Sequence, residues 1–333
     1  MKKVLVGVLA VVMAGSLCAC GNKGNEGGTV GENGEYSIDK ATVFATFDVG
    51  GGVDTFGRDM SAMLKNTGLW DGTFVYENVG GASGQVGLTE ICEQHNGDDS
   101  YLIPTSDNVL QSGYLNNIEG AYGYKDLSLV SRLYCEYRVY VTAPSTGIKS
   151  LDDVLKKAQA GEDIIGGNSG NGGASHIALS GLAYEMGINM RHVPYGDDED
   201  IVAVLSGEAD LGALGSNEAL TYIRSGDLIP LAVAAPERLD QDEMKDVPTC
   251  LELGYDCEFG TSRGWVLPGD VDPAAVEYWD GIFHQLSETE EFQEYVHNAG
   301  GTVAYLGPDD FYESNVTQDS ETRAILEKIG FYD

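Results

Sequence analysis

A run of five glycines interleaved with small polar residues is the part of this sequence best suited to bind a ligand. It extends from Gly166 to Gly173, after an apolar β-branched pair and before residues that can begin a helix at Ala174. Glycines let the backbone approach a ligand closely. The unpaired N–H groups of a first helical turn, at the positive end of the helix dipole, attract anions. The run therefore predicts an anion-binding loop, with a flexible surface loop as the alternative. Neutral donors are available from Asn168, Ser169, Asn171 and Ser175.

Two further glycine-rich loops follow predicted strands in the same way. A strand over 44–47 leads through residues 48–54 into a helix that extends to about Lys65. A strand over 74–76 leads through residues 78–87 into a helix that extends to about Glu93. Three such units predict loops that converge at the carboxyl ends of parallel strands, where open α/β sheets bind ligands.

The elements that must position these loops alternate along the rest of the chain. Ser150, followed by acidic residues, is typical of a helix N-cap. Strands are predicted over 101–104, 127–130, 137–141, 191–195 and 228–234. Helices are predicted over 201–206, 273–285, 290–299 and 320–329. This alternation predicts an α/β fold with parallel sheets covered on both faces.

The first 35 residues predict targeting and a tether rather than folded structure. Residues 1–19 form a lipoprotein signal peptide, with a positive start at Lys2 and Lys3 and an apolar run too short to span a bilayer. Leu17-Cys18-Ala19-Cys20 resembles a bacterial lipobox, which fits lipidation at Cys20 better than at Cys18. A plain secretory signal is the alternative. Residues 20–35 are rich in glycine and polar residues and predict a flexible tether.

Composition restricts the classes of function. The body of nearly 300 residues is long enough for two domains. A formal charge of −34 argues against nucleic-acid binding and against a basic membrane-binding patch. There is no zinc-type CxxC spacing, and neither a metal nor a cofactor is predicted. Cys250 and Cys257 are seven residues apart, and either a disulfide or two buried thiols fits that spacing.

Several motifs occur in the order found in one known family. The chain resembles the tripartite tricarboxylate transporter substrate-binding proteins, also called the Bug family, over about residues 41–333. The motifs are Gly50 to Asp54, Asn78 to Gly87, Asn168 to His176, His192-Val193-Pro194-Tyr195, Gly207 to Asp210, Leu231 to Val233 and Asp246 to Thr249. Each motif alone is weak evidence, whereas seven in family order are specific.

The resemblance implies a type II periplasmic-binding-protein fold, with two lobes, a hinge and an interlobe ligand cleft. Lobe 1 would comprise residues 36–138 plus 241–333, and lobe 2 residues 139–240. The implied function is that of a lipid-anchored extracytoplasmic solute-binding protein, not an enzyme. It would capture a small carboxylate, such as a dicarboxylate, a tricarboxylate or a related organic acid. Its partners would be the permease subunits of a tripartite tricarboxylate-type transporter and, through the N-terminal lipid, the membrane.

The resemblance also places the ligand site in these loops. The expected ligand-binding residues are Val49, Gly50, Gly51, Asp54, Gly81, Ala82, Ser83, Ser169, Gly170, Asn171, Ser175, Tyr195, Asn217 and Arg263.

The sequence departs from the family where Asp48-Val49, Val79-Gly80 and Gly196-Asp197 replace the usual residues, with the loss of two positive charges. Asp48 and Asp197–Asp200 either cap the following helices or face the cleft, in which case the ligand carries a cation or binds with a metal. Arg263 is the best compensating charge, because arginine can hold a carboxylate bidentately.

Three other functions are compatible with parts of the sequence. A receptor for another class of permease would have the same fold. A secreted enzyme could use Ser169, His176 and Asp54 as a triad, but no Gly-x-Ser-x-Gly elbow is present. A surface adhesin would leave the three glycine-rich loops unexplained.

Overall fold

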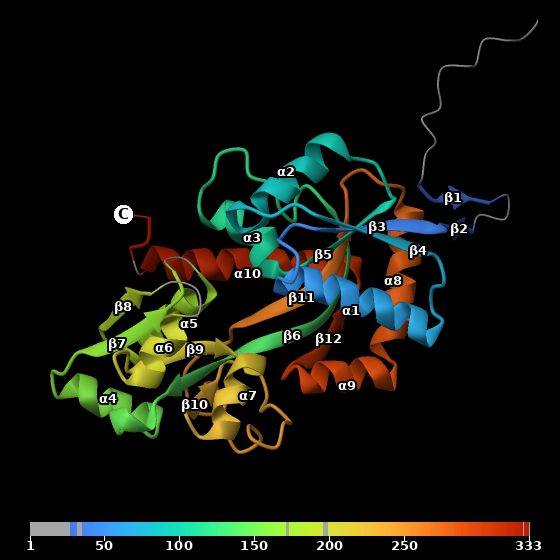
Figure 1. The fold of residues 1–333 in the computed structure, drawn as a ribbon. Helices are drawn as coiled ribbons and strands as arrows, with labels where there is room; N and C mark the ends of the chain where they lie inside the picture. Colours follow the sequence, from blue (N-terminus) through green and yellow to red (C-terminus); the bar gives the residue numbers. More distant parts are fainter. Residues whose placement is uncertain (1–26, 32–34, 171–172, 196–198, 329, 333) are drawn as a thin grey trace, which may run out of the picture.

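A strand of 15 residues, β6 (Ser128–Thr142), runs between the two halves of the molecule (Figure 1). The sequence predicts two strands here, over 127–130 and 137–141. The structure has one, because the intervening residues continue the antiparallel pairing with β11 (Gly260–Leu267). This computed structural model describes residues 27–31, 35–170, 173–195, 199–328 and 330–332. The predicted signal peptide and Cys20 lie outside the described residues.

The first half is built on a parallel arrangement of three strands. In the sheet, β3 (Lys40–Ala45) lies between β4 (Thr73–Asn78) and β5 (Tyr101–Thr105), and β5 pairs antiparallel with β11. The helices of this half are α1 (Gly52–Thr67), α2 (Gln85–Gln94), α3 (Asp107–Leu115), α8 (Pro273–Ser287) and α9 (Glu290–Asn298). Shorter elements are β1 (Thr29–Val30), β2 (Tyr36–Ser37), η1 (Ala82–Gly84) and β12 (Thr302–Leu306), which pairs with β6.

The second half repeats the α/β design. Its central strand β7 (Ile164–Asn168) pairs in parallel with β8 (Met190–Pro194) and β9 (Leu211–Gly215). Both β9 and β10 (Ile229–Val233) pair antiparallel with β6. The helical elements are η2 (Pro144–Thr146), α4 (Leu151–Gln159), α5 (Ala174–Met186), α6 (Glu199–Ser206) and α7 (Ser216–Ser225). The predicted cap is present, since Ser150 Oγ accepts a hydrogen bond from the Asp153 N–H at 3.3 Å.

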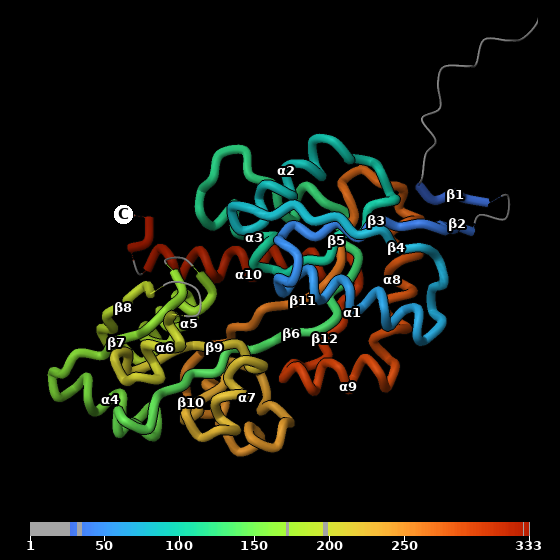
Figure 2. Tube along the Cα trace, viewed as in Figure 1, coloured from blue at the N-terminus to red at the C-terminus, as the bar shows by residue number. Residues whose placement is uncertain are grey.

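The last helix, α10 (Pro308–Lys328), is much longer than the helix predicted over 320–329. It runs along both halves and contacts α3 in one and α5 in the other, as Figure 2 shows. Gln111 of α3 donates a hydrogen bond to Asn315, while Ile325 packs near Gly181 of α5. Most of its residues are polar, so the apolar periodicity that reveals a helix is weak over its first turns.

Buried apolar side chains form separate cores in the two halves. Trp265, Trp279 and Phe283 stack in the core of the first half, and Leu179 and Leu211 belong to a core of the second. The lobe boundaries after residues 138 and 240 remain predictions. None of the helices in the described ranges is long and apolar enough to cross a membrane.

Candidate functional site

The first glycine-rich loop joins β3 to α1 and is organised by Asp54. The Asp54 carboxylate accepts hydrogen bonds from the Gly50 N–H at 2.8 Å, from Arg58 Nε at 2.9 Å and from Asn78 Nδ2 at 3.0 Å. Burial by itself would raise the pKa of Asp54, but these hydrogen bonds hold the pKa below its usual range. The buried Asp54 therefore fixes the conformation of the loop through these hydrogen bonds. Val49, with 72% of its surface exposed, and Gly50, at φ +87°, lie on the outside of the loop.

The second loop follows β4 and packs against the first. Asn78 Nδ2 also donates to the Phe47 carbonyl at 2.9 Å, and Gly80 leaves no space for a side chain beside Asp48. Four consecutive residues, Gly81 to Gly84, have positive φ angles, and two of them are not glycine. Ala82 is at φ +47° and Ser83 at φ +55°, a conformation that costs free energy for an L-residue. Such strain is concentrated at functional sites. Gly81, Ala82 and Ser83 are all exposed.

The third loop joins β7 to α5, as predicted. Ser175 Oγ accepts a hydrogen bond from the Ser169 N–H at 3.1 Å and lies 3.2 Å from Ser169 Oγ. The Gly170 N–H donates to Asn168 Oδ1 at 3.1 Å. Helix α5 begins after Gly173 without a side-chain cap, which leaves first-turn N–H groups for a ligand. The predicted site residue Asn171 lies outside the described residues, as do Gly172 and Asp197.

A cavity of about 230 Å³ lies at this third loop. Of the predicted residues it brings together Ser169 and Ser175. Its lining also includes three charged residues that were not among the predicted ligand-binding residues, namely Arg138, Asp200 and Glu218. The available signal for Arg138 was that it is the one charged residue of the predicted strand over 137–141. Asp200, in the first turn of α6, lines the cavity and accepts a hydrogen bond from the Ile201 N–H at 3.0 Å.

The remaining predicted residues lie around these loops. Tyr195 Oη donates to Glu208 at 3.3 Å, and the Tyr195 N–H donates to the Asn168 carbonyl at 3.0 Å. Asn217 is exposed in the first turn of α7. The Arg263 guanidinium lies close to Gly52 of the first loop, and its Nη2 is 3.8 Å from Glu136 Oε2.

The histidines of the motifs pack against each other beneath the third loop. The ring centroids of His176 and His192 are 4.8 Å apart, and His192 Nε2 lies 3.4 Å from Ser180 Oγ. Burial, and then the neighbouring His176, lower the pKa of His192 to about 4. Because Asp54 bonds to Arg58 and Asn78 in the other half, the geometry does not assemble the triad considered for an enzyme.

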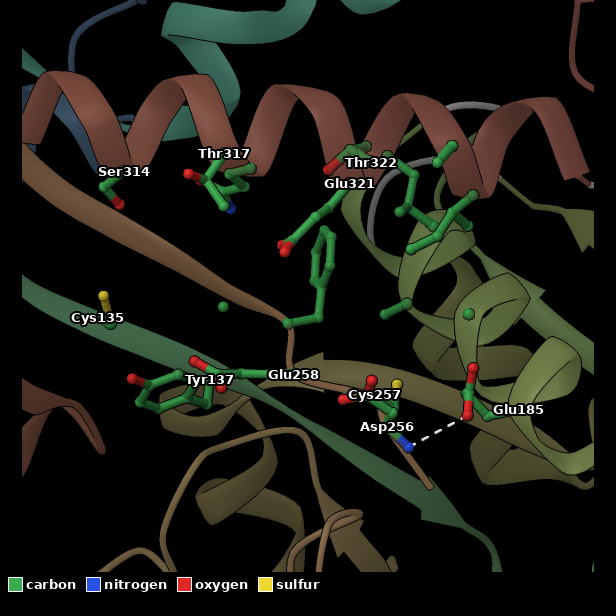
Figure 3. Close-up of a pocket in the computed structure, with 18 of the residues that line it drawn as sticks. Cys135, Tyr137, Glu185, Asp256, Cys257, Glu258, Ser314, Thr317, Glu321 and Thr322 are labelled. Carbon is green, nitrogen blue, oxygen red and sulfur yellow. Dashed lines mark hydrogen bonds between the residues drawn. The ribbon is translucent and has the colours of Figure 1, made fainter. Parts of the chain in front are cut away.

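A larger cavity of about 700 Å³ is lined by other residues of β6 (Figure 3). Cys135 and Tyr137 of β6 face it, whereas Arg138, the next residue, lines the smaller cavity. Glu258 and Glu321 approach each other there, and burial followed by Glu321 raises the pKa of Glu258. Of the predicted site residues that lie in the described ranges, none lines this cavity. Cys250 and Cys257 are both free thiols, and the described residues contain no group of three or more His, Cys, Asp or Glu able to hold a metal ion.

Comparisons with known proteins agree on one family. A family model described as tripartite tricarboxylate transporter family receptor matches residues 65–331. A protein of Bordetella pertussis from the UPF0065 group is 26% identical over 171 residues, which are 49% of this chain and 51% of that protein. The chain thus matches about half the length of this curated relative.

Several solved structures have the same fold, and the similarity extends over nearly the whole length of each of them. A TctC solute-binding protein from Polaromonas has a TM-score of 0.74 at 19% identity, over 87% of this chain and 98% of that one. MatC from Rhodopseudomonas palustris with bound malate has a TM-score of 0.68 at 21% identity, over 86% and 98% of the two chains. A second R. palustris protein, with adipate, has a TM-score of 0.72 at 18% identity, over 87% and 97%. The predicted two-lobed periplasmic-binding-protein fold is confirmed.

Proposed function

Because the chain belongs to the tripartite tricarboxylate transporter receptor family, we propose that it captures a small carboxylate outside the cytoplasmic membrane. The bound acid would then pass to the permease subunits of a transporter of that type. Members of this family are solute-binding receptors, so the chain is a receptor rather than an enzyme. The malate and adipate present in two structural neighbours make dicarboxylates the first ligands to test.

One observation supports a carboxylate as the ligand. The uncapped first turn of α5 and the hydroxyl groups of Ser169 and Ser175 meet at one cavity. Backbone N–H groups and hydroxyls at a helix N-terminus form hydrogen bonds that strengthen when the acceptor carries a negative charge. They bind an anion through local dipoles, which suits a chain whose net charge of −34 repels anions at long range.

The proposed ligand-binding residues come from the three loops and from residues around them. Asp54, which also accepts hydrogen bonds from the first loop and its surroundings, is one of them. The others are Val49, Gly50, Gly51, Gly81, Ala82, Ser83, Ser169, Gly170, Asn171, Ser175, Tyr195, Asn217 and Arg263. Residues 36–138 plus 241–333 and residues 139–240 would form the lobes that close over the ligand.

Lipid anchoring is a separate part of the proposal. The lipobox-like Leu17-Cys18-Ala19-Cys20 supports cleavage after residue 19 and a lipid on Cys20, with residues 20–35 as the tether. The anchor would hold the receptor close to its permease. Fractionation of cells that express Cys20→Ser tests this, because a variant that stays with the membrane would refute lipidation at that residue.

Calorimetric titration with malate, adipate and citrate tests the function directly. We expect one of these acids to bind the wild-type protein. Replacing Ser169 by Ala removes a hydrogen bond to a charged acceptor, worth about 1.5–3 kcal/mol, so the affinity should fall roughly 10- to 150-fold. Ser206→Ala is the matched control, because that exposed hydroxyl bonds, among the described residues, only to backbone groups at the end of its own helix. No binding of any of the acids at millimolar concentration would argue against the proposed function.

A further inference from the structure

Arg138 is the cation that lines the smaller cavity together with Ser169 and Ser175. It lies on β6, where the strand passes from one half of the molecule to the other, and it pairs with Gly215 of β9. Its Nη2 donates to Thr261 Oγ1 at 3.3 Å. Thr261 in turn accepts from Asn108 Nδ2 at 3.4 Å, so the guanidinium is held in place from the first half.

The hydrogen-bonding capacity of Arg138 is only partly used. Its Nε is buried and has no hydrogen-bond partner in the part of the chain that the structure describes. The described hydrogen bond of its guanidinium goes to the neutral Thr261 hydroxyl rather than to a carboxylate. Burial of a cation is costly unless a carboxylate or another strong acceptor compensates. Arg263 differs, since Glu136 already lies 3.8 Å from it.

The charges around Arg138 favour its protonated form. Burial lowers the pKa of Arg138, whereas Glu136, Glu218 and Asp107 raise it and Arg263 lowers it again. Arginine remains charged under these conditions because its ordinary pKa is above 12. The cavity therefore holds a positive charge beside two serine hydroxyls, and its lining also contains the carboxylates of Asp200 and Glu218.

We propose that the Arg138 guanidinium is the charge partner of one ligand carboxylate, which Ser169 and Ser175 bind at the same time. This inference rests on the proposed function and adds the residue that supplies the positive charge. It replaces Arg263 as the main compensating cation, because the carboxylate would complete the unused donors of Arg138. A guanidinium fork suits this task, since it can donate two parallel hydrogen bonds to one carboxylate.

The test compares Arg138→Gln with Arg132→Gln by calorimetric titration of whichever of malate, adipate or citrate binds the wild-type protein. Arg132 lies on the same strand, but it donates to the Ala304 carbonyl and to Ser314 and lines the larger cavity. Both variants lose one positive charge, so long-range electrostatic effects are matched. Loss of one partner of a buried charge pair should lower affinity roughly 30-fold or more in Arg138→Gln. Arg132→Gln should bind as the wild type does.

The other outcomes separate this inference from the proposed function. If Arg138→Gln binds within about threefold of wild type while Ser169→Ala is weakened, Arg138 is not the charge partner and the receptor function stands. An equal loss in Arg132→Gln would also overturn the inference, because it would show a general charge effect. If no acid binds the wild-type protein, both proposals fall.

Arg138→Lys keeps the test decisive where Arg138→Gln does not fold, as judged by a thermal melt. It retains the charge but loses the planar fork, so a folded protein with several-fold weaker binding is expected. Wild-type affinity in folded Arg138→Lys would exclude the bidentate contact.

Discussion

At the scale of single residues, the site is made by side chains that hold one another in place. Ser175 accepts from the Ser169 N–H, and Asp54 accepts from three donors of the first loop and its surroundings. The pair His176 and His192 lies under the third loop in the same supporting role. These contacts orient the loops before a ligand arrives, which reduces the entropy lost on binding.

The His192 environment predicts a pH dependence of stability. Its pKa of about 4 in the folded protein lies below the value of about 6.5 expected for the unfolded chain. As pH falls through this interval, the unfolded state binds a proton that the folded state does not, so stability present above pH 6.5 is lost. Because the ring keeps some contact with water, we expect roughly 1 kcal/mol of loss from His192 between pH 7 and 5.

Chemical denaturation of His192→Gln at both pH values measures this contribution. The stability difference between pH 7 and 5 should be smaller in the variant than in the wild type. His284→Gln, which removes a histidine with half of its side chain exposed, is the control and should keep the wild-type difference. The same pH difference in His192→Gln and wild type would contradict the assignment.

At the scale of elements, the strand–loop–helix unit recurs, and each loop is held in its conformation by different interactions. The first loop relies on the Asp54 carboxylate, and the third on a serine pair at the start of α5. The second relies on backbone conformation, with four successive positive φ angles that lead into α2. Close packing holds that strained conformation, since Gly84 contacts Val109 and the Phe47 ring with no space for a side chain.

Replacing Gly84 by alanine should therefore lower the free energy of unfolding by more than the same replacement at another glycine of similar backbone conformation. Gly84 has φ +90°, and a Cβ there would lie 3.0 Å from Val109 Cγ1. Gly120 has φ +72° and open space around it. We expect Gly120→Ala to lose about 1 kcal/mol from backbone strain, and Gly84→Ala about 2–4 kcal/mol, because overpacking adds to that strain.

Urea denaturation followed by tryptophan fluorescence measures both values. Ligand affinity should fall in Gly84→Ala, because a displaced second loop moves Gly81 to Ser83, and should be unchanged in Gly120→Ala. Equal losses of stability in the two variants would show that packing around Gly84 is less tight than the structure indicates.

At the scale of the whole molecule, two hollows are lined in part by different residues of the same strand, β6. The smaller is lined by Arg138 and the third loop, and the larger by Cys135, Tyr137 and α10 (Figure 3). Since β6 and β11 run between the halves, a rotation about them would change the larger hollow, whose lining includes residues of both α5 and α10. Helix α10 contacts both halves, so its contact with α5 near Gly181 must adjust during such a rotation.

Ligand binding should accordingly make the protein more compact. Hinge closure around a ligand is a common mode of binding in two-lobed receptors. Small-angle scattering with a saturating carboxylate should give a smaller radius of gyration than the free protein, while sodium chloride at equal ionic strength should not. A radius unchanged by saturating ligand would show that the two halves do not move as proposed.

What the sequence by itself determined follows from local physical chemistry. Glycine-rich runs after predicted strands located three strand–loop–helix units, and a serine with acidic residues located the start of α4. Both signals depend on backbone freedom and capping within a few residues. Ser169 and Ser175 were correctly placed together for the same reason, since they flank one turn.

Only the tertiary structure decided features that depend on distant segments. The single strand β6 exists because residues of β11 pair along it. The first turns of α10 form a helix although they lack a clear apolar periodicity, because they contact other elements. Arg138 is a site residue only because β6 presents it to the cavity beside α5, while its neighbour Tyr137 faces the opposite side. Alternation along a strand predicts that these two point to opposite faces, but which face borders the ligand loops depends on how the two halves pack.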